Sequence, residues 1–227
     1  MLEELIELDK SIFLNLNGLR SDWADTFMWW FSQSVTWIPV AVILAAVIIK
    51  AKKRESIWIL IAIGVTVLLA DQISSGLIKN VVERLRPTHE PSLQGLVYTV
   101  NGYVGGKYGF VSSHAANTIG IAVFTMLLFK NRAFSAVILL WALVDSYSRI
   151  YLGVHYPGDI LGGLVVGTFS ALLSFFLLKK LRPKSLHLSR TSTGIDANNG
   201  FSEPQIAVLT ASMILSIVAL SVVSFFC

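Results

Sequence analysis

Six long apolar stretches, separated by polar connections, restrict this chain more than any other feature of its sequence. A helix needs about 20 predominantly apolar residues to cross the hydrocarbon core of a bilayer. Inside lipid the backbone polar groups must be satisfied within the segment, so such stretches form helices. The sequence therefore predicts an all-α, polytopic membrane protein with six transmembrane helices, at about residues 27–49, 57–78, 111–129, 133–151, 157–178 and 204–226.

The composition agrees with this prediction. Of the 227 residues, 54% are hydrophobic and only 14% are charged, whereas a soluble domain carries about 25% charged residues. The length suits a single membrane domain over residues 1–227. Within it, residues 182–203 are predicted to form a polar cytoplasmic linker that leads to the last transmembrane helix at 204–226.

The first residues, 1–22, predict an amphipathic helix that lies at the membrane interface. Apolar residues recur at helical spacing and acidic residues occupy the other side. The same pattern fits a helix that caps the bundle, and the sequence does not separate the two interpretations. The segment is acidic where a signal peptide is basic.

The distribution of basic residues predicts the orientation. Eleven of the eighteen Lys and Arg residues fall in the connections after the first, third and fifth stretches, which share one face of the membrane. Cationic connections stay cytoplasmic, so both termini and the long connection 79–110 are predicted to face the periplasm of a bacterial inner membrane. This topology accounts for the net charge of +4 without a nucleic-acid partner.

Three polar clusters on the predicted outer face bring together cations that lack matching carboxylates. They are KNVVERLRP at 79–87, VSSH at 111–114 and SRIYLGVHYPGD at 148–159. Lys79, Arg86 and Arg149 would repel one another unless an anion lay between them, and arginine suits phosphate. Lys79 and Arg86 are seven residues apart, so they would share a helix face if the helix continued to Pro87.

The second cluster adds donors to this predicted anion site. Ser112 and Ser113 are good N-caps for the helix that follows, and the first turn of a helix presents free N–H groups and the positive end of the dipole. Each piece also has a simpler interpretation, since the cations suit an interfacial position and Ser112 suits a plain cap. The combination is more specific than its parts.

The third cluster predicts the chemistry. Pro157 favours the first turn of a helix, and Asp159 would lie in that turn, close to His155. A carboxylate beside an imidazole fixes its tautomer, which makes His155 a candidate nucleophile that forms a phosphohistidine. His114 would protonate the leaving oxygen and later activate water. The sequence shows no carboxylate cage or cysteine set, so no metal or other cofactor is predicted.

Two aspartates lie inside apolar stretches, where a charge is costly. A structural role is the favoured interpretation for both. Asp145 precedes Arg149 by four residues and is predicted to pair with it across one helical turn. Asp71 is predicted to hydrogen-bond one helix to another.

Taken together, the clusters resemble the signature of the type 2 phosphatidic acid phosphatase (PAP2) family, which shares its site with vanadium haloperoxidases. The first family motif, Lys, six residues and Arg-Pro, and the third, Ser-Arg, five residues, His, three residues and Asp, are matched in full. The second motif is usually Pro-Ser-Gly-His, and here it reads Val111-Ser112-Ser113-His114. The matched positions of the first and third motifs are Lys79, Arg86, Pro87, Ser148, Arg149, His155 and Asp159.

The resemblance implies a metal-independent lipid phosphatase with a six-helix core. His155 would be the nucleophile, Asp159 its partner and His114 the acid and base. The phosphate would be held by Lys79, Arg86, Ser112, Ser113 and Arg149.

The function predicted from the sequence is hydrolysis of a lipid phosphate or diphosphate at the outer leaflet, with undecaprenyl diphosphate as the favoured substrate. Phosphatidylglycerol phosphate, phosphatidic acid and a lipid A phosphate are alternatives, and the oligomeric state stays open. Two rivals come from other classes: a transporter of an anionic solute and a non-catalytic binder of lipid phosphates. Transporters place ionisable groups near the membrane midplane, whereas here they gather at the ends of the stretches.

Overall fold

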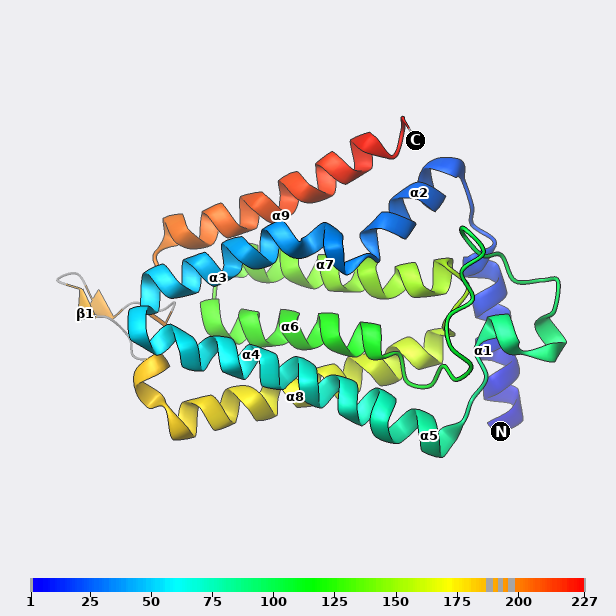
Figure 1. Cartoon of the computed structure of the whole chain (residues 1–227), viewed down its shortest axis with the longest axis horizontal. Coiled ribbons are helices and arrows are strands. Elements are labelled where there is room, and N and C mark those ends of the chain that lie inside the picture. Colours follow the sequence, from blue (N-terminus) through cyan, green and yellow to red (C-terminus); the bar gives the residue numbers. More distant parts are fainter. Residues whose placement is uncertain (1, 187–189, 192–193, 196–198, 227) are drawn as a thin grey trace.

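The computed structural model describes residues 2–186, 190–191, 194–195 and 199–226, and this part of the chain is almost entirely helical. Figure 1 shows the long helices side by side in one bundle. The exceptions are the irregular connection between residues 83 and 112 and a short antiparallel pair of strands. The strands, β1 (Arg190–Thr191) and β2 (Gly194–Ile195), lie within the predicted linker, part of which is outside the described residues. The long helices are α3 (Ile38–Lys52), α4 (Ser56–Asp71), α6 (Ser113–Phe129), α7 (Arg132–Tyr151), α8 (Pro157–Leu181) and α9 (Glu203–Val223).

Among the described residues, four helical stretches are long and apolar enough to cross a membrane: Ser34–Val82, Arg132–Tyr151, Pro157–Leu181 and Glu203–Val223. The first of them reverses direction at the turn η2 (Lys53–Glu55), so it supplies both α3 and α4 (Figure 1). The helix α6 is apolar but has only 17 residues. An all-helical membrane protein is confirmed, while the number of six spans stays a prediction.

Short elements gather at the end of the bundle where α8 begins. The helix α1 (Leu2–Asn17) lies across this end, and the irregular connection between α5 (Lys79–Val82) and α6 runs beside it (Figure 1). The ring of Phe13, fully buried, packs edge-on against Tyr156 at 5.4 Å. The remaining short elements are α2 (Asp22–Phe31), η1 (Ser34–Trp37), η3 (Gln72–Ile78), η4 (Pro87–His89), η5 (Pro91–Leu93) and η6 (Pro183–Leu186).

The contacts of α1 show that it caps the bundle. The amide of Asn17 donates to the carbonyls of Tyr98, Ile150 and Tyr151 at 2.9–3.3 Å. Leu5 and Leu8 on the same helix are more than half exposed. The predicted contact of α1 with the membrane surface stays a prediction, and it would use this exposed apolar side.

Helices α6 and α8 pack backbone against backbone because α8 carries glycines where they meet. A Cβ added at Gly163 would lie 2.5 Å from the Ser112 carbonyl oxygen, and one added at Gly167 would collide with the Ala116 carbonyl. Small residues allow such close approach of helices in membranes. The beginnings of the two helices are joined as well, since Ser112 N donates to Asp159 O at 2.9 Å.

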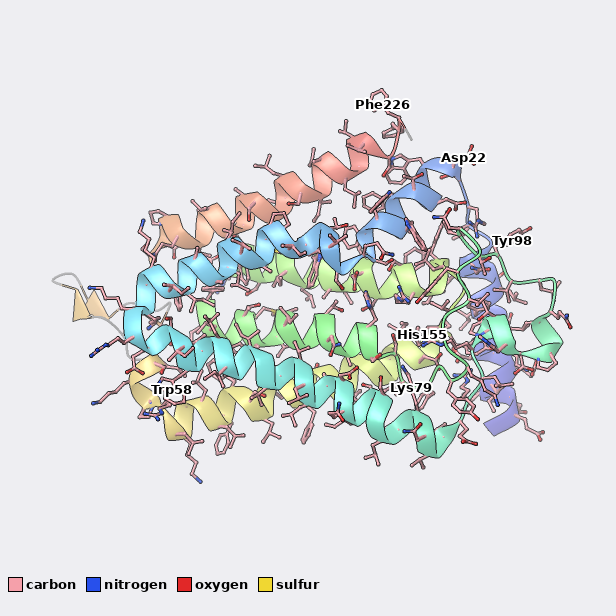
Figure 2. All side chains as sticks on the ribbon, viewed as in Figure 1. Asp22, Trp58, Lys79, Tyr98, His155 and Phe226 are labelled. Carbon is pink, nitrogen blue, oxygen red and sulfur yellow. The ribbon has the colours of Figure 1, made fainter. Side chains whose placement is uncertain are left out.

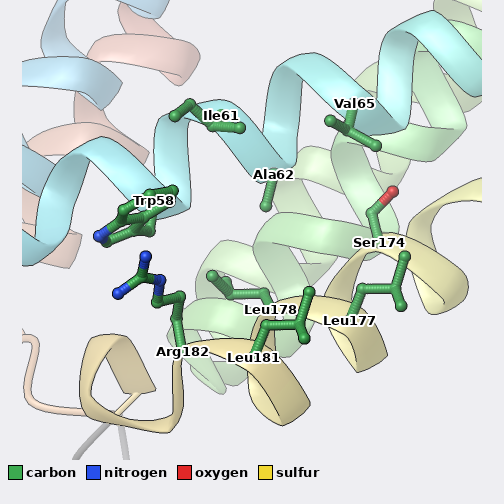
Figure 3. Close-up of a pocket in the computed structure, with 9 residues that line it drawn as sticks. All are labelled: Trp58, Ile61, Ala62, Val65, Ser174, Leu177, Leu178, Leu181 and Arg182. Atoms are coloured by element: carbon green, nitrogen blue, oxygen red, sulfur yellow. The ribbon is translucent and has the colours of Figure 1, made fainter.

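A groove of about 470 Å³ opens between α4 and α8, at the end of the bundle opposite His155 (Figures 2 and 3). The Arg182 guanidinium lies 3.7 Å from the centre of the Trp58 ring in this groove. Neither histidine nor carboxylate occurs among its lining residues, which are Trp58, Ile61, Ala62, Val65, Ser174, Leu177, Leu178, Leu181 and Arg182. The lining of this groove therefore offers no candidate catalytic group.

Candidate active site

The three polar clusters converge at the end of the bundle that α1 covers, where Figure 2 labels Lys79 and His155. Six segments contribute: the beginning of α5, the connection after it, the beginning of α6, the last turn of α7, the connection that leads into α8, and the first turn of α8. The sequence-predicted residues on these segments are Lys79, Arg86, Ser112, Ser113, His114, Arg149, His155 and Asp159.

His155 is 2% exposed and is held through both ring nitrogens. Nδ1 lies 3.2 Å from Asp159 Oδ2, and Nε2 lies 3.0 Å from Arg86 Nη1. A guanidinium only donates, so Nε2 accepts and the ring hydrogen is assigned to Nδ1, which donates to the carboxylate. The Nε2 lone pair of His155 therefore points to the cation that would hold a phosphate.

The surroundings of His155 keep its ring neutral. Burial, followed by the positive charges of Arg86, Arg149 and Lys79, lowers the pKa of His155 well below its ordinary value of 6.5. A neutral imidazole is the form that can attack an electrophile.

Arg86 reaches the site from a loop, and the predicted shared helix face with Lys79 is wrong. The helix α5 ends at Val82, because Glu83 adopts the left-handed conformation with φ 50°. The Arg86 side chain is fixed by the carbonyls of Tyr108 and Val154, to which it donates at 3.1 and 3.2 Å. Burial and then the charge of Arg149 lower the pKa of Arg86, but a guanidinium still remains protonated at neutral pH.

A π-helical segment, η3, directly precedes Lys79, and the sequence did not predict it. Such segments are rare and frequently occur at functional sites. Here it precedes the turn from which Lys79 Nζ donates to Ser113 Oγ at 3.3 Å. The run Ser74-Ser75-Gly76 inside an apolar stretch is the sequence signal for an irregular helix at this point.

The two serines of the second cluster differ in their surroundings. Ser112 is fully buried and its Oγ accepts from Ala115 N at 3.3 Å, so the predicted N-cap is confirmed. Ser113 is half-buried and contacts Lys79. Of the two hydroxyls, that of Ser113 is the one next to a site cation.

Asp145 lies against His114, and its predicted pairing with Arg149 is wrong. The atoms Asp145 Oδ2 and His114 Nε2 are 2.8 Å apart, although they are not aligned as a regular hydrogen bond. The reason is the side-by-side packing of α6 and α7, which turns Asp145 toward the first turn of α6. Arg149 Nη2 instead donates to the Tyr103 hydroxyl at 3.1 Å.

Asp71 has a more local contact than predicted. Its Oδ1 accepts from Ser75 Oγ at 3.3 Å, one turn further along the same helical segment. Asp71 was predicted to hydrogen-bond one helix to another, and in the described residues its side chain bonds within its own helical segment instead.

Two residues of the site were not predicted from the sequence. Arg84 Nη1 lies 3.1 Å from Asp159 Oδ1, and the Tyr103 hydroxyl receives Arg149. Arg84 had a sequence signal, since it is a second arginine inside the first motif. Tyr103 lies in the irregular connection and had none.

The arrangement suits attack on a phosphate. Arg86 contacts His155 Nε2, and the charges of Arg149 and Lys79 act on the same ring. Cations gathered in this way stabilise the charge of a transferring phosphoryl group. His114, whose side chain is 27% exposed, is the more accessible of the two histidines. One histidine can therefore act on phosphorus while the other exchanges protons with a leaving group or water.

Comparison with known proteins supports the same chemistry. The model of the PAP2 superfamily matches residues 55–183. A lipid A 4'-phosphatase of Bacteroides thetaiotaomicron is 39% identical over 183 residues, which cover 80% of this chain and 81% of the relative. A lipid A 4'-phosphatase of Porphyromonas gingivalis is 38% identical, over 73% of this chain and 71% of the relative.

Two solved structures are similar in fold. The LpxE structure of Aquifex aeolicus aligns with a TM-score of 0.58 at 22% identity, covering 74% of this chain and 95% of that one. A PAP2-type phosphatidylglycerolphosphate phosphatase of Bacillus subtilis aligns with a TM-score of 0.57 at 25% identity, covering 80% of this chain and 87% of that one.

Proposed function

The chain belongs to the PAP2 superfamily and is a lipid phosphatase, and from this premise we propose that it removes a phosphate from a lipid A-type glycolipid through a phosphohistidine at His155. One observation carries the chemical part of the proposal. The Nε2 lone pair of His155 faces Arg86, while Asp159 holds Nδ1.

The proposed reaction has two steps, and neither needs a metal. In the first, Arg86 shifts its hydrogen bond from His155 Nε2 to a phosphoryl oxygen, and the freed Nε2 lone pair bonds to phosphorus as the bond from phosphorus to the lipid oxygen breaks. His114 gives a proton to that oxygen, and the lipid leaves as an alcohol. Lys79, Arg86 and Arg149 supply the positive charge for the phosphoryl oxygens, with Ser112 and Ser113 at the beginning of α6.

In the second step a water molecule is the nucleophile. His114 takes a proton from the water, whose oxygen attacks phosphorus while the bond between phosphorus and Nε2 breaks. Inorganic phosphate leaves and His155 is neutral again. Asp159 keeps the hydrogen on Nδ1 throughout, so the same nitrogen is ready for the next cycle.

The choice of a lipid A phosphate rests on the two relatives named for that activity, which are 39% and 38% identical to this chain. Undecaprenyl diphosphate, the substrate predicted from the sequence, stays the second candidate. It is supported by an undecaprenyl-diphosphatase of Sulfolobus acidocaldarius, 28% identical over 74% of this chain and 76% of the relative. The two substrates differ in their leaving group, which is a sugar oxygen in the first and a phosphate in the second.

Phosphate release from purified protein in detergent tests this proposal. The substrates are lipid A with both phosphates, undecaprenyl diphosphate, phosphatidylglycerol phosphate and phosphatidic acid, each with EDTA present. We expect the fastest turnover on lipid A, undiminished by EDTA, with the lost phosphate assigned by mass spectrometry. A loss of activity on chelation that Mg²⁺ restores would refute the metal-independent mechanism. Faster release from undecaprenyl diphosphate would select the second candidate.

The proposal also places the whole chain, as one domain with six spans, in the inner membrane with the site on the periplasmic side. The excess of Lys and Arg in alternate connections supports this orientation. Single cysteines at Lys107 and Lys53, in a Cys227→Ser background, test it in intact cells. A membrane-impermeant maleimide should label position 107 and not position 53, and the reverse pattern would move the site to the cytoplasm.

A further inference from the structure

Arg84 connects the proposed catalytic pair to the N-terminal helix. Its Nη1 lies 3.1 Å from Asp159 Oδ1, and its Nη2 lies 2.8 Å from Asp9 Oδ2. The guanidinium also covers the Tyr156 ring, 4.1 Å from the ring centre. The other oxygen of Asp159, Oδ2, receives Tyr156 N at 3.0 Å and faces His155 Nδ1. Both oxygens of Asp159 are thus engaged, and Arg84 accounts for one of them.

Asp9 holds the beginning of α8 directly as well. Its Oδ1 accepts from Gly158 N at 2.8 Å, one of the N–H groups that the first turn of a helix leaves without a helical partner. The absence of a side chain at position 158 makes this contact possible, because an added Cβ would lie 2.7 Å from Asp9 Oδ2. Asp9 therefore contacts both Arg84 and the helical turn that carries Asp159.

The charges of Asp9 and Arg84 affect Asp159 as well as attaching α1 to the bundle. Asp159 has a fully buried side chain, and removing a partner from a buried charge is strongly destabilising for that charge. Arg84 is 22% exposed and Asp9 is 15% exposed. Without Asp9, Arg84 would keep Asp159 as its single carboxylate partner and would be free to turn toward the solvent.

We propose that Asp9, acting through Arg84 and Gly158, is a positioning residue that holds Asp159 and His155 in register for phosphoryl transfer, so that helix α1 is part of the catalytic assembly. This inference rests on the proposed role of His155. Neither Asp9 nor Arg84 contacts His155 in the described structure, so their effect passes through Asp159.

The attachment of α1 does not depend on Asp9, which makes the inference testable. Phe13 is buried against Tyr156, and Asn17 is buried and bonded to three backbone carbonyls. These contacts remain when Asp9 is changed. Asp9→Asn keeps an oxygen for Gly158 N and removes the charge that orients Arg84.

The experiment compares Asp9→Asn with Glu7→Gln, which removes a carboxylate from the same helix where the side chain is 70% exposed. Turnover is measured on lipid A, or on undecaprenyl diphosphate if the wild-type protein prefers it. For Asp9→Asn we expect kcat to fall roughly 10- to 100-fold, the range for a small misplacement of reacting groups. KM and the melting temperature should stay at the wild-type values, and Glu7→Gln should match the wild type throughout.

Arg84 provides the test of mechanism. Arg84→Lys keeps the charge but lacks the fork that reaches two carboxylates, so its kcat should lie between those of wild type and Arg84→Gln. In an Arg84→Gln background, Asp9→Asn should change kcat by less than about twofold, because coupled residues are not additive. Independent effects of the two changes would refute the inference, as would wild-type kcat for Asp9→Asn.

A second route covers the case in which Asp9→Asn fails to fold. Gly158→Ala pushes a methyl group against Asp9 from the other side and should lower kcat with KM unchanged. Its matched control is Gly106→Ala, at a glycine of the outer connection with no atom near the added Cβ. Equal kcat for the two variants would contradict the inference. Failure of the proposed function is distinct, since it would appear as wild-type protein that forms no phosphohistidine.

Discussion

The two histidines of the site are held in contrasting ways. His155 is 2% exposed, and its carboxylate partner follows four residues later at the beginning of the next helix. The His114 side chain is 27% exposed, and its carboxylate partner, Asp145, belongs to another helix. A group that attacks phosphorus benefits from a fixed position, whereas a group that exchanges protons with a leaving lipid and with water needs access. The structure gives each histidine the surroundings that suit its proposed role.

Removal of His155 should have the largest effect, because no other group can take its place as nucleophile. We expect His155→Ala to lose activity on every lipid phosphate by roughly 10⁶-fold, the scale for loss of a nucleophile in a coupled site. No phosphate label that is both acid-labile and base-stable, as a phosphohistidine is, should be trapped on the variant protein. Label retained on His155→Ala would reverse the assignment of the two histidines.

Removal of His114 should cost less and should depend on the leaving group. General acid and base help contributes roughly 10²–10⁴-fold, so His114→Ala should lose about that much on lipid A, whose leaving oxygen is a poor leaving group without a proton. With an aryl phosphate the first step needs little protonation, so phosphoenzyme should still form and then persist. A uniform loss on both substrates, or a loss far below that range, would contradict the acid and base role.

The partner of His114 should have a smaller effect again. Asp145→Asn removes the charge beside His114 Nε2, and we expect a loss of roughly tenfold in kcat on lipid A from poorer orientation of the ring. The rate of phosphoenzyme formation with an aryl phosphate should not change. Glu83→Gln, an exposed carboxylate near the site, is the control. A rise in KM without loss of kcat would instead indicate that Asp145 orients the cations that bind the phosphate, Lys79, Arg86 and Arg149.

The smallest expected effect is on the pH profile. An imidazole with a pKa of 6.5 is half protonated at pH 6.5, which would halve the nucleophilic fraction. Burial and then the neighbouring cations lower the pKa of His155, so its neutral form persists below pH 6.5 and is lost only in more acidic solution. In His114→Ala with an aryl phosphate, corrected for titration of the substrate, kcat/KM should be equal at pH 7.5 and 6.5. A twofold decrease would show that the ring titrates as an ordinary histidine.

The same contrast explains what could be predicted from the sequence. Pairs that are close in the chain follow from helix geometry, so the contact between His155 and Asp159 and the cap at Ser112 were predicted. Pairs that depend on how helices and loops face one another were not. Asp145 was assigned to Arg149 because the two share a helix, yet the packing of α6 on α7 turns it to His114. Arg84 and Asp9 are 75 residues apart in the chain, beyond any local rule.

The helical pattern was predictable for a similar reason, and its irregularities were not. Apolar stretches and Pro157 placed five of the long helices well, since length and hydropathy decide them. The first predicted stretch, 27–49, is wrong as a single helix, because α2 ends at Phe31 and α3 begins only at Ile38. The end of α5 at Val82 depends on one residue, Glu83, in a left-handed conformation. The π-helical segment before Lys79 is likewise not revealed by periodicity, although the run Ser74-Ser75-Gly76 marks its place in the sequence.

The glycines where α8 meets α6 also determine how freely this chain can vary. Gly163 and Gly167 have no side chain to take part in chemistry, yet a single added methyl group at either position would meet the backbone at the beginning of α6. The two helices would then have to move apart. His114 lies in the first turn of α6, and Asp159, the partner of His155, lies in the first turn of α8, so both histidines would be affected. In a mutational scan, alanine at these two positions should therefore reduce activity as much as a neutral residue does at the charged positions of the site, although glycine has no functional group to lose.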